Sequence, residues 1–61
     1  MTTFTVVLER LLNGSSAGTT EDEIEATSVE DAEAQAIAAW KTVAPRYTYR
    51  PLFTRQNDAA L

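Results

Sequence analysis

The spacing of the apolar residues changes part-way along this chain, and that change constrains the fold more than any other feature of the sequence. Before Ser28, apolar residues occupy alternate positions in two segments, residues 3–10 and 19–26, which is the period of a half-buried β-strand. After Ser28 they recur every three or four positions as far as Val43, which is the period of an amphipathic helix. A third strand candidate, "RYTYRPLFTR", follows at residues 46–55. The sequence therefore predicts the order β-β-α-β.

Glycine, asparagine and proline mark the joints between these segments. Asn13-Gly14 predicts a turn, because both residues tolerate a positive φ, and we expect residues 13–18 to form a loop around it. Pro45 predicts the end of the helix, because the residue before a proline avoids the α conformation. Pro51 cannot donate to a strand ladder, so it indicates an edge, a bulge or the end of the third strand.

The start of the helix has two possible capping arrangements. Ser28 with Asp31 three residues later is typical of a capping box, and Thr27 with Glu30 is the same pattern one residue earlier. The acidic residues of the first turn also suit the positive end of the helix dipole.

These elements predict an α+β fold with a three-stranded antiparallel sheet in the order 2-1-3 and one helix on one face. A right-handed crossover through the helix returns the third strand beside the first. We expect one domain over residues 1–55 and a frayed tail over residues 56–61. The expected core consists of one of the two tyrosines together with Phe4, Val6, Leu8, Ile24, Val29, Ala36 and Trp40.

Composition narrows the function classes. The 61 residues include neither cysteine nor histidine, so no disulfide forms and a zinc site or a His- or Cys-based catalytic site is not expected. Only two glycines are present, which leaves no phosphate-binding loop, and Ser15 and Ser16 have no recognisable base. We therefore expect no enzyme and no cofactor. Because a core this small is marginal, we expect a partner or a homodimer.

Charge and hydropathy give an expected location. The N-terminus lacks a basic segment followed by an apolar run, and no apolar stretch is long enough to span a membrane, so we expect a soluble protein of the bacterial cytoplasm. The net charge of −4 argues against direct nucleic-acid binding, because phosphate contacts require an excess of Lys and Arg.

Seven carboxylates lie between Glu21 and Glu33, without a Lys or Arg among them. One interpretation is that they only keep a strand edge soluble. A second is a calcium site, although the segment lacks the glycine turn of a calcium loop. A third is a row of charge that imitates a nucleic-acid backbone and binds a basic groove on another protein. The expected contact residues are Glu21, Glu23, Glu25, Glu30, Asp31 and Glu33.

The C-terminal third is basic and aromatic. Its tyrosines are either core residues beside solvated arginines, or part of a protein interface, or a stacking surface for single-stranded nucleic acid. For a dimer interface at the uncovered sheet face or at a strand edge, we expect Val7, Tyr47 and Tyr49 near the contact, with Arg46 and Arg50 beside them. A single-strand site would use Arg46, Arg50, Arg55, Tyr47 and Tyr49.

The pattern also resembles a known group of proteins. The opening "MTTFT", which leads into a strand, and the strand-to-helix joint "IEATSVEDAEAQA" are similar to the minimal β-β-α-β members of the phage-encoded anti-CRISPR proteins, over residues 1 to about 43. The basic C-terminal strand departs from an all-acidic mimic. The resemblance implies a stoichiometric inhibitor of a host nucleic-acid machine, such as a CRISPR effector subunit, that works without catalysis or a cofactor.

Overall fold

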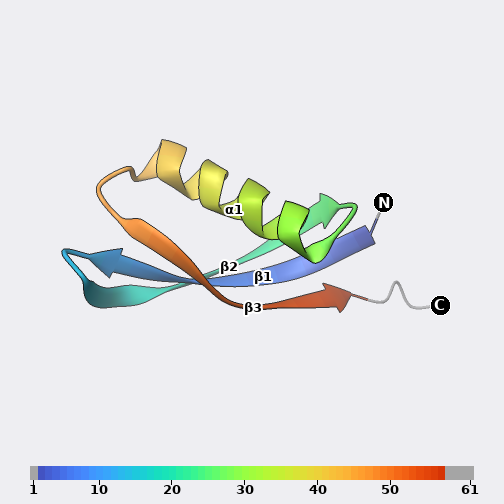
Figure 1. Cartoon of the computed structure of the whole chain (residues 1–61), viewed down its shortest axis with the longest axis horizontal. Helices are drawn as coiled ribbons and strands as arrows, with labels where there is room; N and C mark the ends of the chain where they lie inside the picture. The colour runs from blue at the N-terminus through green and yellow to red at the C-terminus, as the bar shows by residue number, and fades with distance from the viewer. Residues whose placement is uncertain (1, 58–61) are drawn as a thin grey trace.

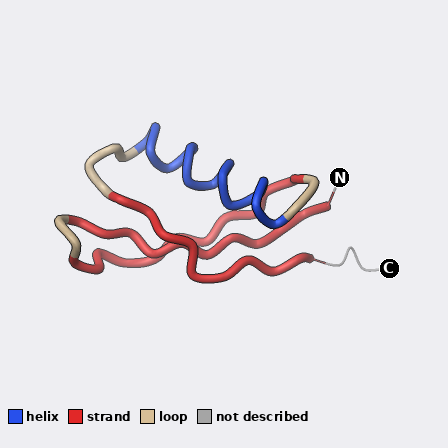
Figure 2. Tube along the Cα trace, viewed as in Figure 1, coloured by secondary structure: helices blue, strands red, loops and turns tan. Residues whose placement is uncertain are grey.

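A computed structural model describes residues 2–57. In chain order the elements are β1 (Thr2–Leu12), β2 (Ser15–Ala26), α1 (Val29–Val43) and β3 (Thr48–Asn57). The three strands form one antiparallel sheet in the order β2-β1-β3, and α1 lies across one face of it (Figures 1 and 2). The predicted fold class and strand order are therefore confirmed.

The register between the strands determines which side chains face the helix. Phe4 of β1 lies opposite Ile24 of β2, and Val6 lies opposite Asp22. Phe4, Val6 and Leu8 are buried, and Val6 and Leu8 are fully enclosed. The even-numbered positions of β1 and their partners therefore form the helix-facing side of the sheet, and the odd-numbered positions form a side that no element within residues 2–57 covers.

The core extends from the sheet into small residues of the helix. Ala32 and Ala36 are the buried residues of α1, and their size lets the helix lie close to the strands. Tyr49 is the buried tyrosine, while Ile24 and Trp40 pack against the core and are partly buried. Ala26, which alternates with Ile24 along β2 but was not among the expected core residues, is also fully buried.

One residue of the expected core was predicted wrongly. Val29 was expected in the core, but 42% of its surface is exposed, because it is the first residue of α1 and lies where the sheet ends. Val43, the last residue of α1, is 74% exposed. Figure 1 shows the helix rising away from the sheet toward this end. The larger rings of Trp40 and Tyr49 fill the wider gap there, with their centroids 6.1 Å apart.

The hairpin between β1 and β2 is longer than expected. The turn itself is confirmed, since Asn13 and Gly14 have φ values of 54° and 84°. The predicted loop over residues 13–18 is wrong, however, because Leu12 already pairs with Ser15 and β2 begins there. A two-residue turn matches the twist of the two strands, so pairing resumes at once.

Both ends of the helix are as predicted. The Asp31 amide donates to the Ser28 hydroxyl at 3.1 Å, so Ser28 is the N-cap, and the Asp31 carboxylate accepts from the Thr27 amide at 3.5 Å. Ala44 caps the other end, directly before Pro45, with its amide donating to the Trp40 carbonyl.

The third strand ends later than expected. β3 runs to Asn57, and Gln56 pairs with Phe4, so the first two residues of the predicted tail belong to the sheet. Asn57 is held by the Thr5 hydroxyl, which donates to its side-chain oxygen at 3.0 Å. The rest of the predicted tail, residues 58–61, lies outside the described residues.

Candidate functional site

The uncovered side of the sheet, which we call the open face, gathers charge along both of its edges. The central strand β1 contributes mainly Thr and Val to this face, between a row of glutamates on β2 and arginines with one phenylalanine on β3. We call Glu21, Glu23 and Glu25 the glutamate row, and Arg50, Phe53 and Arg55 the arginine edge. The central positions between them are Thr3, Thr5, Val7 and Glu9.

The glutamate row is exposed and unpaired within the described residues. Glu21, Glu23 and Glu25 lie opposite Val7, Thr5 and Thr3, none of which can neutralise a carboxylate. Alternate residues of a strand are about 6.6 Å apart, so the three charges form a nearly straight line. The row is therefore a linear negative surface that is free to meet a positive partner.

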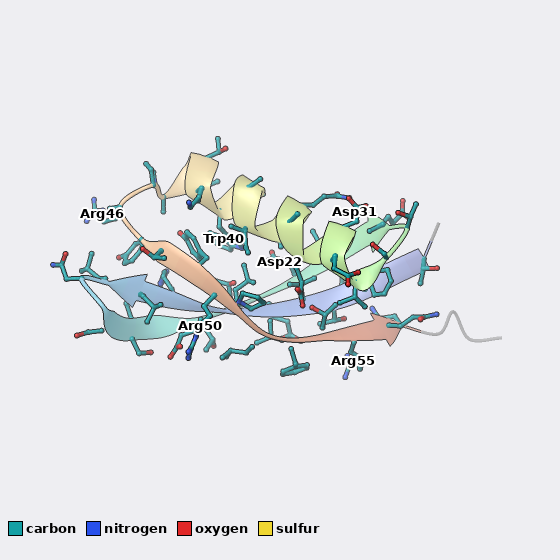
Figure 3. All side chains as sticks on the ribbon, viewed as in Figure 1. Asp22, Asp31, Trp40, Arg46, Arg50 and Arg55 are labelled. Atoms are coloured by element: carbon teal, nitrogen blue, oxygen red, sulfur yellow. The ribbon has the colours of Figure 1, made fainter. Side chains whose placement is uncertain are left out.

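The arginine edge exists because β3 contains a bulge. The pairing of β3 with β1 shifts between Val7–Phe53 and Leu8–Pro51, so Leu52 is an extra residue. Arg50 and Arg55 are an odd number of positions apart and would face opposite sides of a regular strand. The extra residue brings both to the open face, where Figure 3 shows them pointing away from α1.

The two arginines differ in their partners. Arg50 forms an ion pair with Glu9 on the neighbouring strand. A hydrogen bond from the Ser16 hydroxyl, and then the Arg50 guanidinium, hold the pKa of Glu9 below its ordinary value. Arg55 lies opposite Thr5 and forms no ion pair with a described residue. Between them, Phe53 is 56% exposed beside Val7, which leaves an apolar surface between the charged edges.

The structure divides the six predicted acidic contacts between two surfaces. Glu30, Asp31 and Glu33 belong to the first turns of α1, on the other side of the sheet from the glutamate row. Asp31 is part of the helix cap, and the Glu33 carboxylate accepts from the Thr54 hydroxyl at 2.7 Å. Only the three residues of the glutamate row form a continuous line.

The predicted arginine and tyrosine set is divided as well. Tyr49 is 6% exposed and its hydroxyl donates to the Ala44 carbonyl at 3.1 Å. Tyr47 is half-buried beneath the Arg10 guanidinium, which lies 4.9 Å from the ring centroid. Both rings pack on the helix-facing side, whereas Val7 shares the open face with Arg50 and Arg55. The exposed Arg46 precedes β3 and is labelled in Figure 3. The five residues expected for single-strand stacking therefore do not form one surface.

A small pocket lies between α1 and β2. It has a volume of about 240 Å³ and is almost entirely apolar. Its one titratable lining residue is Asp22, whose carboxylate accepts from the Trp40 indole N–H. Sequence reasoning missed this pair, although the position of Asp22 two residues before Ile24 places it on the helix-facing side. A single carboxylate with no second acid or base beside it is a poor basis for acid–base catalysis.

Three further observations concern possible ligands and relatives. In the described part of the chain, Asp and Glu side chains form no group of three that is placed to hold a metal ion. No helix within residues 2–57 is long and apolar enough to cross a membrane. Comparisons with protein-family models, with curated proteins and with solved structures gave no match for this chain.

Proposed function

We propose that this protein is a non-catalytic inhibitor that uses its glutamate row to occupy a basic, nucleic-acid-binding surface of a host protein. The single observation that carries the proposal is the line of Glu21, Glu23 and Glu25 on the open face, exposed and without a cation opposite it. Surfaces that bind phosphate backbones carry Lys and Arg, and a line of carboxylates attracts the same residues. The anti-CRISPR type of inhibitor that the sequence resembles acts on such surfaces.

The positions of the charges support this proposal over a role in solubility alone. Charge that only protects a strand edge needs no particular partner, whereas these three side chains project from the same face as the exposed Phe53 and the partly buried Val7. An apolar centre beside a charged border is the usual composition of a protein interface. The expected host partner is therefore a protein with a basic groove, such as a CRISPR effector subunit.

The test is a phage-plating assay in bacteria with an active CRISPR system, followed by titration calorimetry against the purified effector complex. The wild-type chain should restore plaque formation and bind the effector, and its affinity should fall with added salt, because screening acts on exposed charges. The Glu21→Lys/Glu23→Lys/Glu25→Lys variant should fold, because these side chains are outside the core, but should neither bind nor inhibit.

Two single charge reversals test whether binding depends on the position of the charge or only on the net charge of the protein. Glu23→Lys lies in the glutamate row, whereas Glu30→Lys changes the same charge on the exposed first turn of α1. We expect the first to weaken effector binding by at least about tenfold and the second to leave it unchanged. Equal binding by the triple variant and the wild type would overturn the proposal.

A further inference from the structure

The open face carries opposite charges on its two edges, and we propose that a second copy of this chain covers it. The glutamate row lies on β2, the arginine edge lies on β3, and β1 separates them. Thr5 is paired with Glu23 on one side and with Arg55 on the other, so these three residues form one row across the face. This face is therefore complementary to itself, which is what an interface with two-fold symmetry requires.

Charge selects one of the two ways in which the faces can meet. A two-fold axis parallel to β1 places β2 of each copy over β3 of the other, so that Glu23 meets Arg55 of the second copy. An axis perpendicular to the strands within the sheet plane places β2 over β2, and the two glutamate rows repel each other. In the first arrangement, residues that are paired across the strands of one copy face the same paired residues of the other copy. Val7 of each copy therefore lies next to the axis, and Phe53 of one copy lies over Glu21 of the other.

The edges of the sheet are poorly suited to the alternative, strand-to-strand pairing. β2 presents its three glutamates, and β3 carries Pro51 and the extra residue Leu52 in the middle of its length. On the open face, the apolar surface of a single copy comes from the partly buried Val7 and the 56% exposed Phe53. Face-to-face packing at about 10 Å, as in a β-sandwich, buries it.

The size of the face indicates a weak, reversible dimer. The molecule measures 42 × 17 × 15 Å, so a face along its length is at most 17 Å wide. Two faces of this size cover on the order of 1,200 Å² in total, which is the lower limit for stable interfaces. We therefore expect a dimer that dissociates on dilution and in high salt.

Self-association and target binding use the same glutamates and so compete. The arginine edge of the second copy occupies the glutamate row in place of the basic surface of the target. The dimer proposal does not depend on the inhibitor proposal, and a variant at Arg55 tests the two proposals separately. Arg55→Glu removes the charge partner within the dimer but leaves the glutamate row intact for the target.

The experiment is sedimentation velocity over a concentration series at low and at high salt. The wild type should approach twice 6.7 kDa at high concentration. Glu23→Arg and Arg55→Glu should each weaken the dimer at least about tenfold. The double variant Glu23→Arg/Arg55→Glu should restore the dimer, whereas Glu30→Arg, on the helix layer, should not alter it. Circular dichroism verifies that each variant folds.

Cross-linking tests the geometry independently, because the chain has no cysteine of its own. A Val7→Cys variant should be linked into a dimer by a short bismaleimide, since Val7 lies next to the axis, and Ala38→Cys on the exposed side of α1 should not. A wild type that stays monomeric at every concentration would overturn the proposal. So would an Arg55→Glu variant that dimerises like the wild type, or equal linking of both cysteine variants. Target binding that survives in Arg55→Glu while no dimer forms in the wild type would leave the inhibitor proposal standing.

Discussion

The indole N–H of Trp40 donates a hydrogen bond to the carboxylate of Asp22, with 2.5 Å between the two atoms. This contact joins the last turns of α1 to the edge strand β2 at the end where the helix stands furthest from the sheet (Figure 3). The same ring packs against Tyr49, so Trp40 provides both the apolar packing and the side-chain hydrogen bond of this region.

Replacing Trp40 should separate these two contributions. Trp40→Ala removes the ring and should lower the free energy of unfolding by about 3–5 kcal/mol, enough to unfold much of a domain this small. Trp40→Phe keeps a ring but loses the donor to Asp22, and should cost about 1–2 kcal/mol. Urea denaturation followed by circular dichroism measures both, and a Trp40→Phe variant as stable as the wild type would show that the hydrogen bond contributes nothing.

Thr20 offers a stabilising substitution. It is 9% exposed on the helix-facing side of β2, and its hydroxyl has no hydrogen-bond partner among the described residues. Valine has the same shape without the polar group, so Thr20→Val should raise the free energy of unfolding by about 1 kcal/mol. The exposed Thr19→Val serves as the control, because it changes the same atoms where water can satisfy the hydroxyl. A melting temperature that falls for Thr20→Val would contradict this expectation.

The two possible helix caps can be compared directly. Ser28 accepts from the Asp31 amide, whereas the Thr27 side chain forms no hydrogen bond in the described structure. Ser28→Ala should therefore destabilise the fold by about 1 kcal/mol, and Thr27→Ala should have little effect. Thermal denaturation of the two variants checks this, and a larger loss for Thr27→Ala would place the cap one residue earlier.

Gly18 should tolerate substitution less well than Gly14. Its φ is 117°, and an added Cβ would lie 3.0 Å from the Arg10 guanidinium, which donates to the Ala17 carbonyl and covers Tyr47. Gly18→Ala should cost about 1–2 kcal/mol for the positive φ, and more if Arg10 is displaced. Gly14 also has a positive φ, of 84°, but open space surrounds it. Gly14→Ala therefore measures only the energetic cost of a positive φ at a non-glycine residue. Equal unfolding free energies for the two variants would show that Arg10 moves without penalty.

Lowering the pH should remove the contribution that ionised Glu9 makes to the stability of the fold. The Ser16 hydroxyl and the Arg50 guanidinium lower the pKa of Glu9 in the folded state, so its contribution to stability is present above the ordinary value of 4.5 and is lost as the pH falls through the folded pKa. The stability difference between the wild type and Glu9→Gln should therefore shrink below pH 4.5. Ser16→Ala should remove part of this pH dependence. A difference that grows on acidification would contradict the sign.

Local features of the sequence determined most of the fold. The alternation of Phe4, Val6 and Leu8, the turn at Asn13-Gly14 and the cap at Ser28 each depend on neighbouring residues alone, because strand period, positive φ and helix capping are short-range effects. The glutamate row was predictable for the same reason, since its members alternate along one strand.

Only the tertiary structure decided what lies beside that row. Regular alternation places Arg50 and Arg55 on opposite sides of β3, and the extra residue Leu52 brings them to the same side. That bulge arises from pairing with β1, between residues more than 40 positions apart, and a shift of one residue exchanges the two faces of a strand. The exposure of Val29 likewise depends on where the sheet ends beneath the helix, which the local sequence does not determine. The sequence by itself determined the elements and their order, while the long-range register determined that acid and base share one uncovered face.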